Sequence, residues 1–198
     1  MTISKWTTDR LTLRRFTPDD VNLLVELDSD PAVMRYLSGG ASTPPELIRR
    51  TILPRVLKSY SLGEGYGVWA AFERSSGTFL GWISLTMAEK SGVREARLGY
   101  RLRRAAWGNG YATEGASALI QTGFTKLGLQ RIVASTYEHN IASRRVLEKL
   151  GMRLVRKYHP TPDALRSTGL YDTSTITDMW EGDDVDYAIE RDEWRRSS

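Results

Sequence analysis

Residues 100–116, YRLRRAAWGNGYATEGA, combine residue types that suit a phosphate-binding loop. A strand-like run ends there, a basic loop follows, two glycines flank Asn109, and a helical pattern begins. The first N–H groups of a helix have no intrahelical partners and carry partial positive charge. Glycine lets such a backbone approach a bulky anion closely. We therefore expect the N–H groups of residues 108–113 to bind a phosphate or pyrophosphate.

The glycine spacing alone also fits a tight strand-to-helix turn that binds nothing, and it excludes two nucleotide-binding motifs. No Gly-Lys-Ser/Thr follows a four-residue gap, so the loop is not a P-loop. The dinucleotide fingerprint requires a third glycine three residues after Gly110, where Thr113 stands. Arg101, Arg103 and Arg104 are expected to add long-range attraction for an anion.

A second group of polar residues lies downstream, where residues 140–152 are NIASRRVLEKLGM. Asn140 is a natural N-cap, and Gly151 follows the end of the expected helix. Asn140 can be a plain cap or can also contact a ligand, because polar groups converge at a helix start. Leu147 and Leu150 are expected to pack in the core.

Together these segments resemble the GNAT N-acetyltransferases, and in particular their ribosomal-protein N-acetyltransferase branch. The run WGNGYATEGASALIQTGF is similar to motif A, which is W-G-x-G-Y-A-T-E-A in that branch. Trp107 stands where the wider superfamily has Gln or Arg. Residues 140–152 are similar to motif B, N-x-x-S-x-x-x-L-E-K-x-G-F. The runs TDRLTLRRFTPDD and DVDYAIERDEW also resemble this branch, so the resemblance covers nearly the whole chain.

The resemblance implies that acetyl-CoA is the co-substrate and that the glycine loop and the start of the downstream helix hold it. The cofactor-binding residues that it implies are Arg103, Trp107, Gly108, Asn109, Gly110, Tyr111, Ala112, Thr113, Asn140 and Ser143.

The resemblance also implies direct transfer, in which an amine attacks the thioester without a covalent enzyme intermediate. The tyrosine that protonates the leaving thiolate in many relatives corresponds to Leu147 here, and in the ribosomal-protein branch a serine matching Ser143 replaces it. We therefore expect Ser143 to donate a proton to the sulfur, directly or through water. The candidate general bases are Glu138 and Glu95, each of which can instead be a surface charge, and His139, whose imidazole suits proton transfer near neutral pH.

The elements that must position these residues predict a mixed α/β (α+β) fold in one domain, residues 1–198. The expected strands cover residues 10–16, 66–72, 79–87, 96–102, 131–137, 152–158 and 185–189. The expected helices cover residues 17–28, 112–127 and 140–150, and another opens at residues 43–46 and is interrupted by Pro54. We expect irregular chain at residues 31–40, turns at residues 160–182 and a polar tail. The resemblance implies the GNAT acyl-CoA N-acyltransferase fold, a mixed twisted sheet of about six to seven strands flanked by about four helices.

Composition narrows the class of protein. Hydrophobic residues make up 40% and charged residues 26%, as in soluble globular proteins. The chain has no cysteine and two histidines, so thiol catalysis is excluded and no metal site is expected. We expect a cytoplasmic protein without a membrane span, because no long apolar run occurs. The net charge of +4 favours anionic ligands, but the arginines cluster around the glycine loop, so no nucleic-acid partner is expected.

The expected activity is transfer of an acetyl group from acetyl-CoA to a primary amine, with a protein N-terminal α-amine as acceptor. The alternatives are a small-molecule amine or antibiotic N-acetyltransferase and a non-catalytic acyl-CoA-binding module. The chain is expected to be a monomer or a homodimer. We expect the acceptor groove to be lined by Tyr36 and residues 160–182. Within that segment the residues that could either grip the acceptor or fill an ordinary structural role are Tyr171, Asp172, Asp178 and Trp180.

Overall fold

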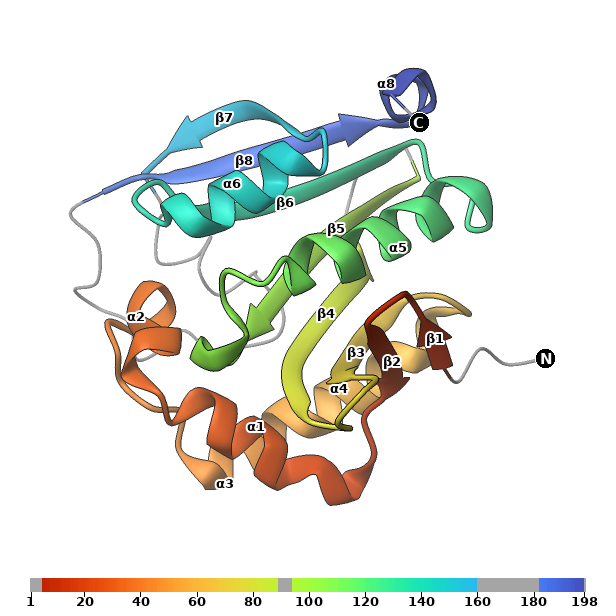
Figure 1. Ribbon diagram of the computed structural model, residues 1–198. Coiled ribbons are helices and arrows are strands. Elements are labelled where there is room, and N and C mark those ends of the chain that lie inside the picture. The colour runs from red at the N-terminus through yellow and green to blue at the C-terminus, as the bar shows by residue number, and fades with distance from the viewer. Residues whose placement is uncertain (1–4, 89–93, 160–181, 198) are drawn as a thin grey trace.

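The computed structural model of this chain describes residues 5–88, 94–159 and 182–197. Within these residues, eight strands form one sheet with the order β1-β2-β3-β4-β5-β6-β8-β7 (Figure 1). Every neighbouring pair is antiparallel except β5 and β6, which run parallel. The strands are β1 (Lys5–Thr7), β2 (Leu11–Arg15), β3 (Gly67–Glu73), β4 (Phe79–Met87), β5 (Glu95–Leu102), β6 (Arg131–Tyr137), β7 (Arg153–Tyr158) and β8 (Asp184–Glu190). The predicted mixed sheet is confirmed.

Within the described residues, the helical segments fall in four groups along the chain: between β2 and β3, between β5 and β6, between β6 and β7, and after β8. The α-helices are α1 (Val21–Asp28), α2 (Pro31–Ser38), α3 (Pro45–Leu47), α4 (Leu53–Ser59), α5 (Tyr111–Thr125), α6 (Ile141–Lys149) and α8 (Arg191–Ser197). Short 3₁₀ segments cover Pro18–Asp20, Tyr60–Leu62 and Arg104–Ala106, and a π-helical segment covers Ile48–Ile52.

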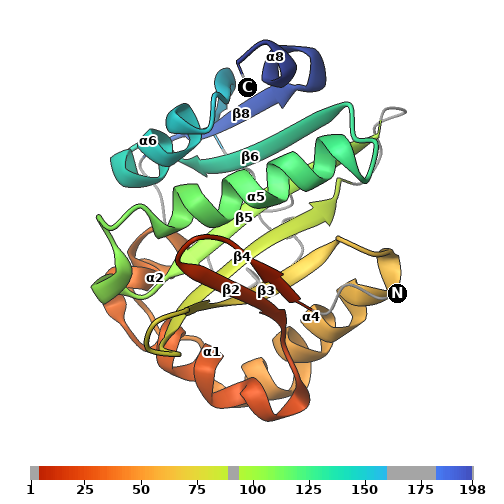
Figure 2. The same ribbon diagram turned by 45° about the vertical axis from the view of Figure 1, so that its right-hand side comes forward.

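The two faces of the sheet carry different helices and different parts of the core. α5 lies over β4 and β5 on one face, and α6 lies beside it over β6 (Figure 2). Leu119 and Ile132 are buried on this face. α1 and α4 cover the opposite face, where Leu24 and Val56 are buried. The carboxyl ends of β5 and β6 therefore lie next to the amino ends of α5 and α6.

Residues 31–40 are not irregular, because they contain α2. Asp30 caps this helix by accepting a hydrogen bond from the Ala32 N–H at 2.8 Å, and Pro31 occupies the first turn. Gly39 ends the helix in the left-handed conformation, with a φ of 65°. Proline lacks an N–H but needs none at the first helical position, so Pro31 begins a helix here where we expected it to end one.

Two further elements correct the predicted ends of the chain. β1 adds an edge strand, and the Trp6 ring meets the edge of the Trp69 ring at 5.8 Å. The tail forms α8, in which the Trp194 ring packs 5.4 Å from Phe124. Three strand residues are too few for an alternation pattern to stand out, and the mostly polar sequence of α8 conceals Trp194, the side chain that packs against Phe124.

The helix that opens at residues 43–46 is not broken at Pro54, but changes from π-helical to α-helical just before it. The chain from α3 to α4 passes through the π-helical turn Ile48–Ile52, and Pro54 lies in the first turn of α4. A wider turn at this point fits a proline that supplies no N–H to the helix. In the part of the chain that the structure describes, no helix is both long and apolar enough to span a membrane.

Candidate active site

β5 and β6 pair over three residues and then separate. Their parallel register covers residues 95–97 of β5 and residues 131–133 of β6. β5 stays paired with β4 as far as Leu102, and β6 stays paired with β8 as far as Tyr137. Residues 98–102 and 134–137 therefore form no ladder with each other, and the opening widens toward the starts of α5 and α6 (Figure 1). Backbone groups at such an inner edge can pair with an extended ligand.

The loop from β5 to α5 carries two glycines in conformations that other residues rarely adopt. Gly108 and Gly110 both adopt left-handed conformations, with φ values of 76° and 80°. Gly110 is the N-cap of α5, so no side chain caps the helix. A Cβ placed on Gly108 would meet no heavy atom within 4 Å. The loop thus leaves space beside the amino end of a 15-residue helix.

Local hydrogen bonds shape the rest of this loop. The Trp107 indole N–H donates to the Leu102 carbonyl at 2.8 Å, and the Asn109 side chain donates to the Trp107 carbonyl at 3.0 Å. The Trp107 side chain is 47% exposed. Tyr111, Ala112 and Thr113 form the first turn of α5. The structure therefore brings all the predicted loop residues from 107 to 113 together at one helix start.

The arginines around the loop do not all face it. Arg101 is buried and forms an ion pair with Asp28 at 2.5 Å, so its charge is balanced beneath the sheet. Arg103, predicted to bind the cofactor, pairs with Glu26 of α1, and its guanidinium lies 5.2 Å from the centre of the Phe79 ring. The long-range attraction expected from Arg101 and Arg103 is thus reduced by these partners.

Ser143 and Asn140 lie at the start of α6, beside the separated strands. The Asn140 Oδ1 accepts a hydrogen bond from the Ser143 N–H at 3.2 Å, which confirms Asn140 as the helix cap. The Tyr100 hydroxyl lies 3.0 Å from the Ser143 Oγ and donates to the Ser143 carbonyl at 3.0 Å. Burial raises the pKa of Tyr100 to about 12, so its hydroxyl stays protonated near neutral pH.

Tyr100 was not predicted as a site residue. The sequence places it only within the expected strand of residues 96–102, where it stands between Leu98 and Leu102. A hydroxyl-bearing ring in an otherwise aliphatic row was the available signal, because a buried tyrosine hydroxyl usually has a hydrogen-bond partner.

Glu138, a predicted general base, is held by two neighbours. Its carboxylate accepts hydrogen bonds from the Lys157 ammonium at 2.7 Å and from the Asp183 N–H at 2.8 Å. The hydrogen bond from Lys157 and that from Asp183 lower the pKa of Glu138. A carboxylate held in its ionised form this way is a weak proton acceptor near neutral pH.

The other two candidate bases lie in different places. Glu95 begins β5 and forms an ion pair with Arg131 at 3.3 Å, within the paired part of the two strands. The structure therefore does not bring Glu95 to the separated ends, because the length of β5 lies between them. His139 follows β6, and its ring meets the edge of the Tyr137 ring at 5.3 Å.

The predicted acceptor groove is described in part. Tyr36 of α2 packs against Tyr137 at the open end of β6, with ring centres 5.7 Å apart. Tyr36, Tyr137 and His139 thus form an aromatic group at this end of the sheet. The predicted groove residues Tyr171, Asp172, Asp178 and Trp180 lie outside the described residues.

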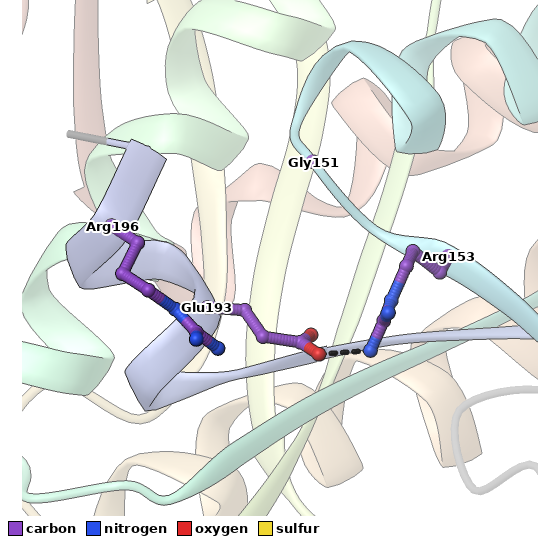
Figure 3. Close-up of a pocket in the computed structure, with 4 residues that line it drawn as sticks. All are labelled: Gly151, Arg153, Glu193 and Arg196. Carbon is purple, nitrogen blue, oxygen red and sulfur yellow. Dashed lines mark hydrogen bonds and ion pairs between the residues drawn. The ribbon is translucent and has the colours of Figure 1, made fainter.

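A surface pocket lies elsewhere on the molecule, away from the starts of α5 and α6. It is lined by Gly151, Arg153, Glu193 and Arg196, and the Glu193 carboxylate points toward Arg153 and pairs with it (Figure 3). Arg153 lies opposite Ala188 in the sheet, and Ala188 lies opposite Val133. The pocket is therefore beside the paired end of β5 and β6. In the described parts of the chain, no group of three or more His, Cys, Asp or Glu residues is placed to hold a metal ion.

Comparison with known proteins identifies the family. The model of the acetyltransferase (GNAT) domain matches residues 10–153. A protein of Aspergillus fumigatus named FsC-acetyl coenzyme A-N(2)-transacetylase is 31% identical over 196 residues, which cover 96% of this chain and 77% of that protein.

Solved structures share the fold at lower identity. Ribosomal-protein-S5-alanine acetyltransferase from Vibrio fischeri has a TM-score of 0.72 at 15% identity and covers 96% of this chain and 98% of its own. Spermidine N-acetyltransferase from Vibrio cholerae, in complex with CoA and spermine, has a TM-score of 0.71 at 13% identity, with 95% and 99% covered. The fold predicted from the two motifs is therefore confirmed.

The contacts of Glu138 predict a pH-dependent contribution to stability. Because its folded-state pKa is lowered, this contribution is present above the unfolded pKa of about 4.3 and is lost as the pH falls through the folded pKa. Glu138→Gln should therefore lower the melting temperature at pH 7 and change it little at about pH 2.5. Thermal unfolding followed by circular dichroism at both pH values measures this. Equal losses at both values would contradict it. Lys157→Met, which removes the partner, should show the same pH dependence.

Proposed function

Because this chain belongs to the GNAT acetyltransferase family, whose members use acetyl-CoA, we propose that it transfers the acetyl group to a primary amine by direct attack. The observation that carries the proposal is the separation of β5 from β6 beside an amino end of α5 that has no side-chain cap. An extended thioester cofactor with a pyrophosphate needs both features: an inner strand edge for its arm and free helix N–H groups for its phosphates.

The described residues fit this cofactor at three points. The N–H groups of residues 108–113 would hold the pyrophosphate in the space beside Gly108. The inner edge of β5, residues 98–102, would pair with the amide groups of the arm. Asn140, at the start of α6, would contact the arm close to the thioester. Trp107 and Arg103 would contact the cofactor at the edge of the loop. Arg103 would first have to leave its ion pair with Glu26.

The reaction requires one bond to form and one to break. The amine nitrogen bonds to the carbonyl carbon of the thioester, and the carbon–sulfur bond then breaks and leaves a thiolate. We assign to Ser143 the hydrogen bond and proton that the departing sulfur needs, directly or through water. The amine loses a proton to solvent, and Ser143 regains a proton from solvent, so the protons balance. The Tyr100 hydroxyl has one proton, so the serine proton becomes free to donate to the sulfur when the tyrosine proton moves from the Ser143 carbonyl to the Ser143 Oγ.

The preferred acceptor is a protein N-terminal α-amine, as expected from the resemblance to the ribosomal-protein branch. A small-molecule amine is the second candidate, and one observation favours it: the name of the 31% identical relative, FsC-acetyl coenzyme A-N(2)-transacetylase, mentions no ribosomal protein. The two solved structures described above, named for a ribosomal protein and for spermidine, are similarly close in fold, so the fold supports both candidates equally. The assignment of residues 1–198 to one domain and the expectation of a monomer or homodimer remain predictions.

Filling the open space at Gly108 should abolish cofactor binding. Gly108→Trp should raise the dissociation constant of free CoA by about 100-fold or more, because the ring would occupy the proposed phosphate site. Isothermal titration calorimetry measures the change. The matched control is Gly77→Trp, since Gly77 has a similar φ of 69° and also meets nothing within 4 Å, but lies in the β3–β4 turn. Wild-type affinity in Gly108→Trp, or no CoA binding by the wild type, would refute the proposed cofactor site.

Removing the proposed proton donor should slow the chemical step. Ser143→Ala should lower kcat by about 100-fold, within the range for general acid catalysis, with a much smaller change in KM for acetyl-CoA. Tyr100→Phe should have a smaller effect of the same kind, because it acts through Ser143. Steady-state kinetics with a thiol-detecting assay measures both. Unchanged kcat in Ser143→Ala would remove this residue from the mechanism.

An acceptor screen distinguishes the two candidate substrates. Purified protein and acetyl-CoA are incubated with peptides of varied N-terminal residue, with the same peptides blocked at the α-amine, and with a panel of polyamines and other small amines. Acetylation confined to free peptide α-amines, detected by mass spectrometry, is the expected result. Turnover of small amines alone would favour the second candidate. CoA binding without acetylation of any amine would instead favour a non-catalytic acyl-CoA-binding module.

A further inference from the structure

Arg10 lies in the turn between β1 and β2, and its side chain reaches the glycine loop from 99 residues away in the sequence. Its Nη1 donates to the Asn109 carbonyl at 2.9 Å, and its Nε donates to Glu114 at 2.7 Å. The guanidinium stacks over the Tyr111 ring at 4.7 Å. Its Nη2 lies 3.4 Å from where a Cβ on Gly110 would stand, so the guanidinium lies against the backbone of the loop.

The turn that carries Arg10 is itself held from two sides. Glu114 accepts hydrogen bonds from the Thr8 hydroxyl at 2.5 Å and from the Arg10 N–H at 2.8 Å. On the other side, the Arg74 guanidinium donates to the carbonyls of Thr8 and Asp9 at 2.8 and 3.0 Å. The position of the Arg10 side chain is therefore fixed by α5 and by the end of β3, and the side chain then contacts the loop.

We propose that Arg10 is a positioning residue for the phosphate-binding loop: by holding the Asn109 carbonyl, it directs the Gly110 N–H toward the bound phosphate. The carbonyl of Asn109 and the N–H of Gly110 belong to one trans peptide, in which these two groups point in opposite directions. Fixing the carbonyl on Arg10 therefore turns the N–H to the other side. Because residue 110 is a glycine, no Cβ on that side of the peptide opposes a flip, so an external contact is needed to select its orientation.

The same contact also balances a charge beside the loop. Glu114 lies in the first turn of α5, where an unpaired carboxylate would repel a phosphate held by that turn. Arg10 pairs with Glu114, whose side chain is 17% exposed, and so removes this repulsion. Arg10 thus contributes an orientation effect through Asn109 and a charge effect through Glu114.

The inference rests on the proposed cofactor site. A shortened acetyl donor distinguishes an effect of Arg10 on the phosphate-binding loop from an effect on folding alone. Acetyl-pantetheine carries the thioester and the arm but lacks the pyrophosphate. If Arg10 acts on the phosphate-binding loop, its loss should weaken binding of CoA and leave use of acetyl-pantetheine unaffected. If Arg10 only stabilises the fold, both donors should suffer alike.

The test compares Arg10→Met, Arg10→Lys and Arg74→Met with the wild type. Arg10→Met keeps an apolar stem over Tyr111 and removes the donors, so the dissociation constant of free CoA should rise about tenfold or more, with kcat/KM for acetyl-pantetheine unchanged. Arg10→Lys has one nitrogen for two acceptors and should give an intermediate loss. Arg74→Met cuts the turn from β3 and leaves the contacts to Glu114 and Asn109 in place, so it should weaken CoA binding less than Arg10→Met does.

The double variant Arg10→Met/Glu114→Gln divides the two effects, because it removes the uncompensated carboxylate and leaves the peptide free. It should recover part of the lost CoA affinity. Wild-type CoA affinity in Arg10→Met, or an equal loss with acetyl-pantetheine, would overturn the inference. Circular dichroism and melting temperature establish that each variant is folded, and Arg10→Lys decides the matter if Arg10→Met is not. Absence of CoA binding by the wild type would overturn the proposed function as well, and titration of the wild type detects that separately.

Discussion

Two parallel strands that separate after three paired residues impose a hydrogen-bonding constraint on everything around them. The backbone groups on the inner edges of β5 and β6, residues 98–102 and 134–137, must find partners other than each other. A buried polar group left without a partner costs about 1–3 kcal/mol, so a filled opening would be unfavourable. An opening that admits solvent or an extended ligand satisfies those groups. The separation is therefore the feature on which the proposed cofactor site depends.

The separated end of β5 is held from both faces of the sheet. On the α6 face, Tyr100 bonds to Ser143 at the start of that helix. On the opposite face, the next residue, Arg101, is paired with Asp28 at the end of α1, and both side chains are buried. Removing one partner of a buried pair typically costs about 3–5 kcal/mol, because a charge is left uncompensated. Alternation along one strand thus fixes β5 between two helices while its edge remains open.

The elements that could be predicted from sequence are those that carry their own signals. α5 and α6 have helical periodicity, and Asn140 and Gly151 mark the limits of α6, so the loop and the cap were found with nearly correct bounds. α2 was missed because Pro31 can end one helix or begin another, and only the Asp30 cap decides. The Tyr100–Ser143 and Arg10–Asn109 contacts span 43 and 99 residues. Such contacts follow from the order of the strands, which no local pattern encodes.

The glycine loop shows why a motif is not the same as a working site. Its glycines allow several backbone orientations, and the glycines by themselves do not favour one orientation over another. Selection comes from Arg10, whose position depends on the β1–β2 turn being bound to Glu114 and to Arg74. A phosphate that binds only the selected orientation must also favour the docked turn, since a ligand stabilises whichever state binds it. Cofactor binding and docking of the amino-terminal hairpin are thereby linked, so the affinity of the loop depends on the fold of a strand pair that the motif does not include.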